Sequence, residues 1–308
     1  MRACTITVPS STANLGPGFD SIGMALNKYL TLQVEEHSEW VFKHHSVHLP
    51  PAPPLQEHLI YQAAEHTARR FNATLPPCKV SVFSEIPLAR GMGSSASAIV
   101  AGVELANWLC GLALSDSDKL ASATELEGHP DNVAPAIFGG LVINAQTRDG
   151  DIHYVQVYDL DLDLILYIPD FELKTEAARK VLPDHYARSE AASAGGIGNV
   201  FVASLLTGNF ETAGNMMEQD LFHEPYRATL IPLYESIRKE AKSLGAYGTV
   251  ISGAGPTMIS LVPKGKGKAI SAIMKELLPS YSVEVIRMDL DGTRVELNAG
   301  FPNSVHGF

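Results

Sequence analysis

Apolar residues alternate with polar ones along some stretches of the chain and recur every three or four positions along others. Alternation is typical of a strand, whereas the longer spacing is typical of an amphipathic helix. These patterns predict strands over residues 3–8, 29–35, 40–48, 78–84, 139–147, 152–158, 162–168, 247–251, 257–262 and 281–288. They predict helices over residues 58–72, 95–110, 115–127, 175–182, 185–207, 230–243 and 265–278. This mixture predicts an α+β fold.

Three segments interrupt these patterns with glycine, proline and small polar residues. Residues 9–20 predict a turn-rich loop, in which Asn14 and Asp20 either face a ligand or satisfy amides of the turn. Residues 128–135 form a short polar segment that contains two prolines. Residues 252–257 form a glycine-rich turn between two strands. Such a turn either lies against a ligand or simply reverses the chain.

Residues 87–102 combine a predicted strand end, a glycine-rich turn and a helix start. Gly91 and Gly93 allow a ligand to approach the main chain, and Ser94 and Ser95 are suited to the helix start. The first amides of a helix have no internal partner, so this stretch predicts a phosphate cradle. The alternative is an ordinary loop before a well-capped helix. The motif is neither a Walker loop nor Gly-x-Gly-x-x-Gly.

Composition narrows the function classes. The chain has 308 residues, of which 45% are hydrophobic and 19% charged, and its formal net charge is -11. An acidic chain lacks the basic footprint of a nucleic-acid-binding protein. No stretch approaches the roughly 20 apolar residues of a membrane span, and no apolar signal core is evident. The three cysteines are too few for a disulfide framework. We therefore expect a cytoplasmic protein with reduced thiols.

Several charged residues are candidates for chemistry, although each has an ordinary alternative. Glu125 or Glu127 can complete a magnesium site, or can simply be the solvated end of a helix. Arg179 and Arg227 can hold a carboxylate through paired hydrogen bonds, or can be surface residues. The glycines at 195–198 resemble a dinucleotide loop only superficially, because no strand precedes them.

Taken together, the segments at 9–26, 87–97 and 252–257 resemble the three signature motifs of the GHMP kinases. This superfamily contains galactokinases, homoserine kinases, mevalonate kinases and phosphomevalonate kinases. The strings at 10–20, 129–135 and 224–227 are most similar to its homoserine kinase branch. The resemblance implies two α+β lobes with the active site between them. Residues 1–160 would form an ATP-binding lobe like domain 2 of ribosomal protein S5, and residues 161–308 a ferredoxin-like lobe.

The same resemblance implies a set of site residues. The triphosphate of ATP would be wrapped by Pro87, Leu88, Ala89, Arg90, Gly91, Met92, Gly93, Ser94, Ser95, Ala96 and Ser97. The substrate pocket would be lined by Asn14, Asp20, Asn132, Thr175, Arg179, Arg227 and Gly255. Ser95 and Glu125 would ligate Mg²⁺, with Glu127 left open as the alternative. Met92 replaces the leucine usual in the family, a volume-conserving change.

The implied activity is direct in-line transfer of the γ-phosphoryl group of ATP to the hydroxyl of L-homoserine, in threonine biosynthesis. No lysine stands beside Asp131, so Asp20 and Asn132 would orient the hydroxyl without a dedicated base. A homodimer is expected, with neither nucleic acid nor membrane as partner. The alternatives are a GHMP kinase for a sugar or a mevalonate-like alcohol and a non-catalytic ligand-binding relative. A nicotinamide oxidoreductase is disfavoured, because neither glycine cluster lies in a strand-helix-strand unit with an acidic residue for the ribose.

Overall fold

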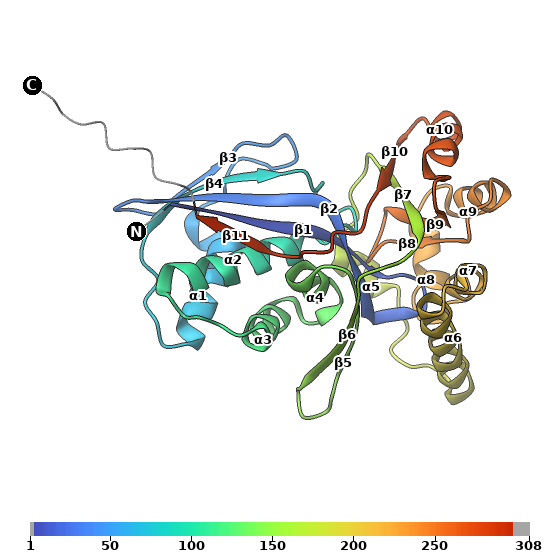
Figure 1. Ribbon diagram of the computed structural model, residues 1–308, viewed down its shortest axis with the longest axis horizontal. Coiled ribbons are helices and arrows are strands. Elements are labelled where there is room, and N and C mark those ends of the chain that lie inside the picture. Colours follow the sequence, from blue (N-terminus) through green and yellow to red (C-terminus); the bar gives the residue numbers. More distant parts are fainter. Residues whose placement is uncertain (1–2, 298–308) are drawn as a thin grey trace, which may run out of the picture.

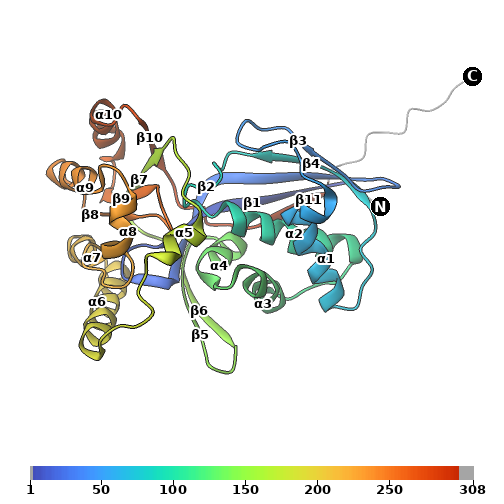
Figure 2. The same ribbon diagram turned by 180° about the vertical axis from the view of Figure 1, so that it is seen from behind.

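The computed structural model of the protein describes residues 3–297. In this range it forms two lobes, each built on one sheet, that lie end to end along the long axis of the molecule (Figure 1). Helices α1–α4 cover one face of the first sheet, and helices α5–α10 belong to the second lobe. The view from behind shows the β1–β2 turn reaching across to α6, α7 and α8 of the second lobe (Figure 2). The two lobes therefore meet where the sequence places its motifs.

The first lobe holds a largely antiparallel sheet in the order β11-β1-β2-β4-β3, with β5 and β6 added beside β2. The strands are β1 (Cys4–Asn14), β2 (Gly18–Glu36), β3 (Val41–His44), β4 (Cys78–Ser84), β5 (Leu141–Gln146), β6 (Ile152–Val157) and β11 (Arg294–Leu297). The helices are α1 (Leu59–Arg70), α2 (Ser94–Cys110), α3 (Asp116–Glu127) and α4 (Pro130–Phe138), preceded by a short 3₁₀ turn at Leu55–Glu57.

The second lobe holds an antiparallel sheet in the order β10-β7-β9-β8. Its strands are β7 (Leu162–Pro169), β8 (Gly248–Ile251), β9 (Met258–Pro263) and β10 (Tyr281–Ile286). Its helices are α5 (Thr175–Lys180), α6 (Arg188–Leu206), α7 (Phe210–Met217), α8 (Glu224–Arg227), α9 (Tyr234–Ser243) and α10 (Gly267–Leu277), with a 3₁₀ turn at Ala228–Leu230. Numbered along the chain, the strands run 4-1-3-2, which is the ferredoxin-like arrangement. The strand predicted at 162–168 forms as β7, and it lies inside the sheet rather than at an edge.

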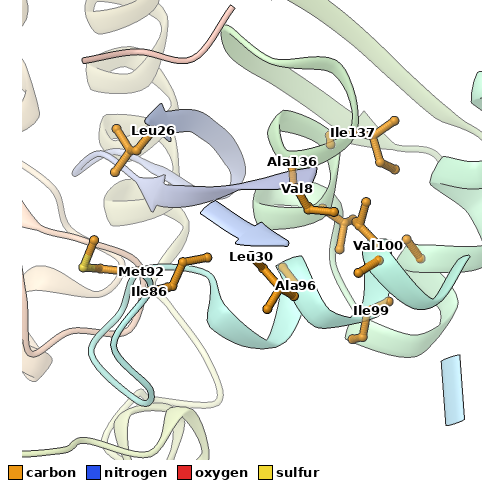
Figure 3. Close-up of a cluster of buried hydrophobic side chains, with 14 of the residues drawn as sticks. Val8, Leu26, Leu30, Ile86, Met92, Ala96, Ile99, Val100, Ala136 and Ile137 are labelled. Carbon is orange, nitrogen blue, oxygen red and sulfur yellow. The ribbon is translucent and has the colours of Figure 1, made fainter. Parts of the chain in front are cut away.

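The core of the first lobe lies between its sheet and α2 and α4. Val8 and Leu30 of the sheet, Ala96, Ile99 and Val100 of α2 and Ala136 and Ile137 of α4 gather there (Figure 3). Met92 of the glycine-rich loop is only 1% exposed and belongs to the same cluster. The buried Met92 side chain anchors the glycine-rich loop to the core. The backbone of the loop is therefore held in one place.

Two of the irregular segments are in fact regular, and the sequence-based prediction was wrong there. Residues 9–20 are not a long loop: β1 continues to Asn14 and β2 begins at Gly18. The buried hydroxyls of Ser10 and Ser11 hide the strand pattern, because they bond to Leu26 O and Asn132 Oδ1 rather than to water. The polar segment at 128–135 contains the start of helix α4.

Proline explains the second error. Pro130 stands at the first turn of α4, where a missing backbone N–H costs nothing. The pattern also missed α7, α8 and β11. Short helices with few apolar positions carry too little periodicity to be distinguished from turns.

The predicted division at residue 160 falls between β6 and β7, which belong to different sheets. Strand β11 is the exception, because the chain returns after β10 and pairs Arg294–Leu297 with β1 of the first sheet. The boundary itself stays a prediction. Within residues 3–297 no helix has both the length and the apolar character needed to cross a membrane.

Candidate active site

The three segments that resemble family motifs, at 9–26, 87–97 and 252–257, meet at the junction of the lobes. The turn at 252–257 lies against the β1–β2 hairpin, where Gly253 N donates to Ala13 O at 3.0 Å. It also lies against the glycine-rich loop, where Thr257 N donates to Arg90 O at 3.2 Å. Ser252 Oγ links both neighbours, at 2.8 Å from Thr12 Oγ1 and 2.6 Å from Gly91 O. The segments that resembled one family in sequence are thus one structural unit.

Gly91 and Gly93 are required by this packing. Both have a left-handed φ, of +73° and +66°. A Cβ on Gly91 would lie 2.3 Å from Ser252 O, and one on Gly93 would lie 2.1 Å from Ser11 Oγ. Glycine is therefore needed at both positions, because it adopts the left-handed conformation without strain and lets the neighbouring segments approach closely.

Helix α2 begins directly after this loop, where the sequence predicts a phosphate cradle. Its N-cap is Gly93, so Ser94 and Ser95 lie inside the first turn rather than capping it. The first amides of the helix have no partner within it, and the positive end of its dipole faces the cavity at this point. Ser95 Oγ donates to Glu127 Oε2 at 3.1 Å, and both residues line the cavity.

Glu125 lies elsewhere, which corrects the expectation that it stands beside Ser95. Its carboxylate is half exposed and pairs with Arg70, close to His66. Glu125 is two positions before Glu127 on α3, and residues two apart point to different sides of a helix. Only Glu127 therefore reaches the loop. Burial raises the pKa of the Glu127 carboxyl, although His129 and the Ser95 hydrogen bond oppose the shift.

A second polar group comes from the start of α4. His129 Nδ1 donates to Asp131 Oδ1 at 2.5 Å, and Asn132 Nδ2 donates to the same oxygen at 3.3 Å. Ser11 Oγ donates to Asn132 Oδ1 at 2.9 Å, which fixes the orientation of the amide. Burial disfavours the charged form of His129, but the hydrogen bond and charge of Asp131 outweigh it and raise the histidine pKa.

The β1–β2 turn contributes Asn14 and Asp20, and both have a left-handed φ despite carrying side chains. Asn14 Nδ2 donates to Gly253 O at 2.8 Å, and its Oδ1 accepts from Asp20 N at 3.0 Å. Asn14 therefore ties the lobes together and holds Asp20 in place. Backbone outliers of this kind gather at functional sites, because the surrounding structure must maintain them.

Arg179 on α5 and Arg227 on α8 face this turn in different ways. Arg179 Nη2 and Nη1 donate to the Asp20 carboxylate at 2.9 and 3.4 Å. Arg227 is 1% exposed, and it donates to the carbonyls of Ala178 and Gly253. Within residues 3–297 no carboxylate lies at ion-pair distance from Arg227. Burial, and then the charge of Arg179, lower the pKa of the Arg227 guanidinium.

An apolar cavity of about 320 Å³ adjoins the start of α2. Its walls come from the 3₁₀ turn, α1 and β4, and they share Ala89, Ser94 and Ser95 with the polar cavity. The apolar walls include Leu49, Pro50, Pro53, Leu59, Ile60 and Leu88. The two cavities together suit a ligand with a flat apolar part and an anionic part.

The structure therefore brings most of the predicted residues into one site. The polar cavity is lined by Asn14, Asp20, Ala89, Gly91, Met92, Gly93, Ser94, Ser95, Asn132, Thr175, Arg179 and Arg227. Other predicted residues support this site from outside the polar cavity: Ala96 is buried, Ser97 bonds to Pro9 O and Gly93 O, and Arg90 ties the loop to residues 169–172. Leu88 lines the apolar cavity, Pro87 lines neither, and Gly255 packs against Gly91.

Sequence reasoning did not assign five of the cavity residues, and it named Glu127 only as the alternative to Glu125. The five are His129, Asp131, Leu173, Gly253 and Ala254. All of them except Leu173 lie within a segment already singled out, but the choice between neighbours depends on which side of a helix or turn faces the cavity. Carboxylate oxygens of Asp20 and Asp131 and a ring nitrogen of His129 lie within 4.8 Å of one another. This cluster has no signature in sequence, because its members come from β2 and α4.

Comparison with known proteins agrees with this geometry. The family model described as the GHMP kinases N terminal domain matches residues 58–140, and that described as GHMP kinases C terminal matches residues 201–280. The fold is shared more widely: the mevalonate kinase of L. major, only 16% identical, superimposes with a TM-score of 0.70 over 93% of this chain and 95% of that one.

Homoserine kinases are among the relatives that match over nearly their whole length. A homoserine kinase of Oceanobacillus iheyensis is 49% identical over 94% of this chain and 98% of its own length. One from Streptococcus agalactiae is 47% identical over 94% of this chain and 99% of its own. The homoserine kinase from Cytophaga hutchinsonii is 27% identical in sequence. Its crystal structure superimposes with a TM-score of 0.84 over 96% of this chain and 98% of that one. The chain is a GHMP kinase and belongs to the homoserine kinase family.

Proposed function

We propose that the protein transfers the γ-phosphoryl group of ATP to the side-chain hydroxyl of L-homoserine. The observation that carries this proposal is the Arg227 guanidinium, which is buried at the cavity without a carboxylate partner in the described chain. A buried charge is costly unless it is paired, so this arrangement is stable chiefly as a receptor for an anionic group. The α-carboxylate of an amino acid is such a group.

The charges around Arg227 favour an amino acid over a plain carboxylic acid. Asp20 and Asp131 stand beside the arginines and supply acceptors for an ammonium group. In the structure Asp20 is paired with Arg179. A zwitterion can replace this pair with two others, its carboxylate on the arginines and its ammonium on Asp20. Mevalonate has no ammonium group, so its carboxylate would take Arg179 from Asp20 without giving Asp20 a new partner.

The nucleotide and metal are assigned to the remaining parts of the site. The start of α2 would hold the phosphates, and the apolar cavity would hold the base. Ser95 and Glu127 offer the hard oxygen ligands that Mg²⁺ prefers, 3.1 Å apart at the same helix start. The metal would supply charge neutralisation on the phosphate oxygens. We propose Glu127 in place of Glu125 for this role.

In the proposed reaction the homoserine hydroxyl oxygen forms a bond to the γ-phosphorus, and the bond from that phosphorus to the β–γ bridging oxygen breaks. The hydroxyl proton passes to a phosphoryl oxygen or to water. Asp20 and Asn132 position the hydroxyl, and Ser11 holds Asn132 in one orientation. Such transfer depends mainly on positioning and charge stabilisation, so no dedicated base is needed.

The product would enter threonine biosynthesis, and we propose a cytoplasmic homodimer as the working form. The free cysteines Cys4 and Cys78 support a reducing compartment. Within the described chain β6 pairs only with β5, which leaves a strand edge that a second copy can extend. Light scattering on the purified chain distinguishes a dimer of about 66 kDa, twice the 33.1 kDa chain, from a monomer, and a monomer at all concentrations would contradict this part.

The substrate assignment is tested by ADP release with MgATP and a panel of alcohols. L-homoserine, D-homoserine, L-serine, mevalonate and galactose are compared at equal concentration. We expect turnover with L-homoserine alone. Turnover confined to mevalonate or galactose would keep the phosphate site and overturn the amino-acid pocket, and silence with every alcohol would support a non-catalytic relative.

A further inference from the structure

The two arginines of the proposed carboxylate site stand over the same aromatic ring. The Cζ atoms of Arg179 and Arg227 lie 5.8 and 5.4 Å from the ring centroid of Phe19. The guanidiniums carry like charges, and the charge of Arg179 adds to burial in lowering the pKa of Arg227. In the free protein the ion pair with Asp20 holds Arg179 in place. When the substrate ammonium takes over Asp20, another interaction must offset the repulsion between the two guanidiniums.

His223 of the segment before α8 supports the ring and one of the arginines. Its ring stacks on Phe19, with centroids 5.4 Å apart and an interplanar angle of 25°. Nε2 lies 2.9 Å from Gly16 O, and since a carbonyl only accepts, Nε2 carries the proton. Complete burial lowers the pKa of His223, so the ring is neutral and Nδ1 is an acceptor. Arg227 Nη1 donates to it at 3.4 Å.

Asp220 holds this support in place. Its Oδ2 accepts from His223 N at 2.7 Å and from Glu224 N at 2.8 Å. Asp220 is 5% exposed, and its Oδ2 lies 3.7 Å from His223 Nε2. The half-buried ring of Phe19 therefore stacks on a buried histidine whose own hydrogen bonds fix its position before any ligand binds.

We propose that Phe19 is a positioning residue, which holds Arg179 and Arg227 side by side so that both guanidiniums meet the substrate carboxylate. The face of an aromatic ring is electronegative and attracts cations within about 6 Å of its centroid. One ring therefore offsets part of the repulsion between two cations and lowers the cost of arranging them. The proposal rests on the proposed function, because the anion that the pair receives is the carboxylate of L-homoserine.

The test compares Phe19→Leu, which removes the π-system, with Phe19→Tyr, which keeps it. Phe222→Leu is the matched control, since its ring lies 6.4 Å from that of Phe19 and neither guanidinium is recorded over it among residues 3–297. We expect Phe19→Leu to raise KM for L-homoserine about tenfold, with kcat and KM for ATP within about twofold of wild type. Phe19→Tyr and Phe222→Leu should stay close to wild type.

Two further measurements separate positioning from general packing. In an Arg179→Ala background, Phe19→Leu should raise the homoserine KM by a smaller factor than in wild type, because one of its two cations is gone. Pentafluorophenylalanine at position 19 keeps the shape of the ring but reverses its polarity, and should behave as leucine does. Because the fluorinated ring fills the same space, this variant still tests the role of the π-system if the leucine variant fails to fold.

The proposal is overturned if Phe19→Leu and Phe19→Tyr raise the homoserine KM equally, if the ATP KM rises as much, or if the fluorinated ring behaves as phenylalanine. Failure of the proposed function is visible separately, in the wild-type protein. If wild type phosphorylates another carboxylate-bearing alcohol instead, the same variants are measured with that alcohol, and the comparison between leucine and tyrosine still decides.

Discussion

At the scale of single residues, the site depends on which of two similar neighbours faces the cavity. Glu125 and Glu127 are identical in chemistry and belong to the same helix, yet one pairs with Arg70 and the other with Ser95. The reason is the rotation of about 200° that separates positions two apart on an α-helix. The two arginines at the cavity also differ, although they come from different helices: Arg227 on α8 is buried, whereas Arg179 on α5 is partly exposed.

This difference gives a matched pair of variants. Glu127→Gln removes the proposed metal carboxylate, and we expect kcat to fall about 100-fold with a higher Mg²⁺ requirement. Glu125→Gln removes only an exposed ion pair, which contributes at most about 1 kcal/mol, so activity should stay within about twofold of wild type. Steady-state kinetics at several Mg²⁺ concentrations provide the measurement. Equal losses in the two variants would remove Glu127 from the metal site.

At the scale of elements, the loop before α2 is shaped by its contacts with two other segments. Gly91 packs against the turn at 252–257, and Gly93 packs against Ser11 of β1. The loop therefore takes its form from the hairpin and the turn, and not from its own sequence alone. The amides at the start of α2 are presented in a fixed direction as a consequence.

Helix α2 offers a control for this dependence, because left-handed glycines stand at both of its ends. A Cβ on Gly111, where φ is +61°, would have no neighbour within 4 Å, whereas a Cβ on Gly93 would meet Ser11 Oγ at 2.1 Å. Gly111→Ala should cost about 1 kcal/mol of unfolding free energy and leave the ATP KM unchanged. Gly93→Ala should cost more and raise the ATP KM severalfold.

Urea unfolding and ATP saturation curves give the two quantities. A Gly93→Ala protein with the stability and ATP KM of Gly111→Ala would show that the contact with Ser11 does not shape the phosphate site.

At the scale of the whole molecule, buried histidines couple folding to pH. His58 is only 4% exposed, and its ring stacks on that of Phe42. Its Nε2 lies 3.0 Å from His44 Nε2. Burial, and then the charge of His44, lower the pKa of His58 to about 4. The folded protein therefore keeps a neutral ring that the unfolded chain would protonate.

The stability that His58 contributes is complete above its unfolded pKa of 6.5 and is lost as the pH falls toward about 4. Across this window the unfolded state binds one more proton than the folded state. Each such histidine therefore lowers the unfolding free energy by about 1.4 kcal/mol for every unit by which the pH falls. His58→Gln should reduce the slope of unfolding free energy against pH by about this amount. The exposed His153 on β6 is the control, and its glutamine variant should keep the wild-type slope.

Chemical denaturation at a series of pH values from 4 to 7 measures these slopes. An unchanged slope in His58→Gln would mean that His58 is protonated alike in the folded and unfolded states.

Local and apolar features of this protein could be predicted from its sequence. Strand and helix periodicity located most elements, and three motifs marked the segments at 9–26, 87–97 and 252–257 that meet between the lobes. These features could be predicted because backbone preferences and burial patterns depend on neighbouring residues. The resemblance of those motifs to one superfamily is confirmed by full-length relatives.

Features that depend on distant partners required the folded chain. The polar strand end at 9–14 is a strand because Ser10 and Ser11 find acceptors on β2 and α4. Glu127 rather than Glu125 faces Ser95, and Phe19 lies beneath two arginines that follow it by more than 150 residues in the chain. Hydrogen bonds and charge contacts across such separations leave no period in the sequence, so they are settled only when the lobes come together.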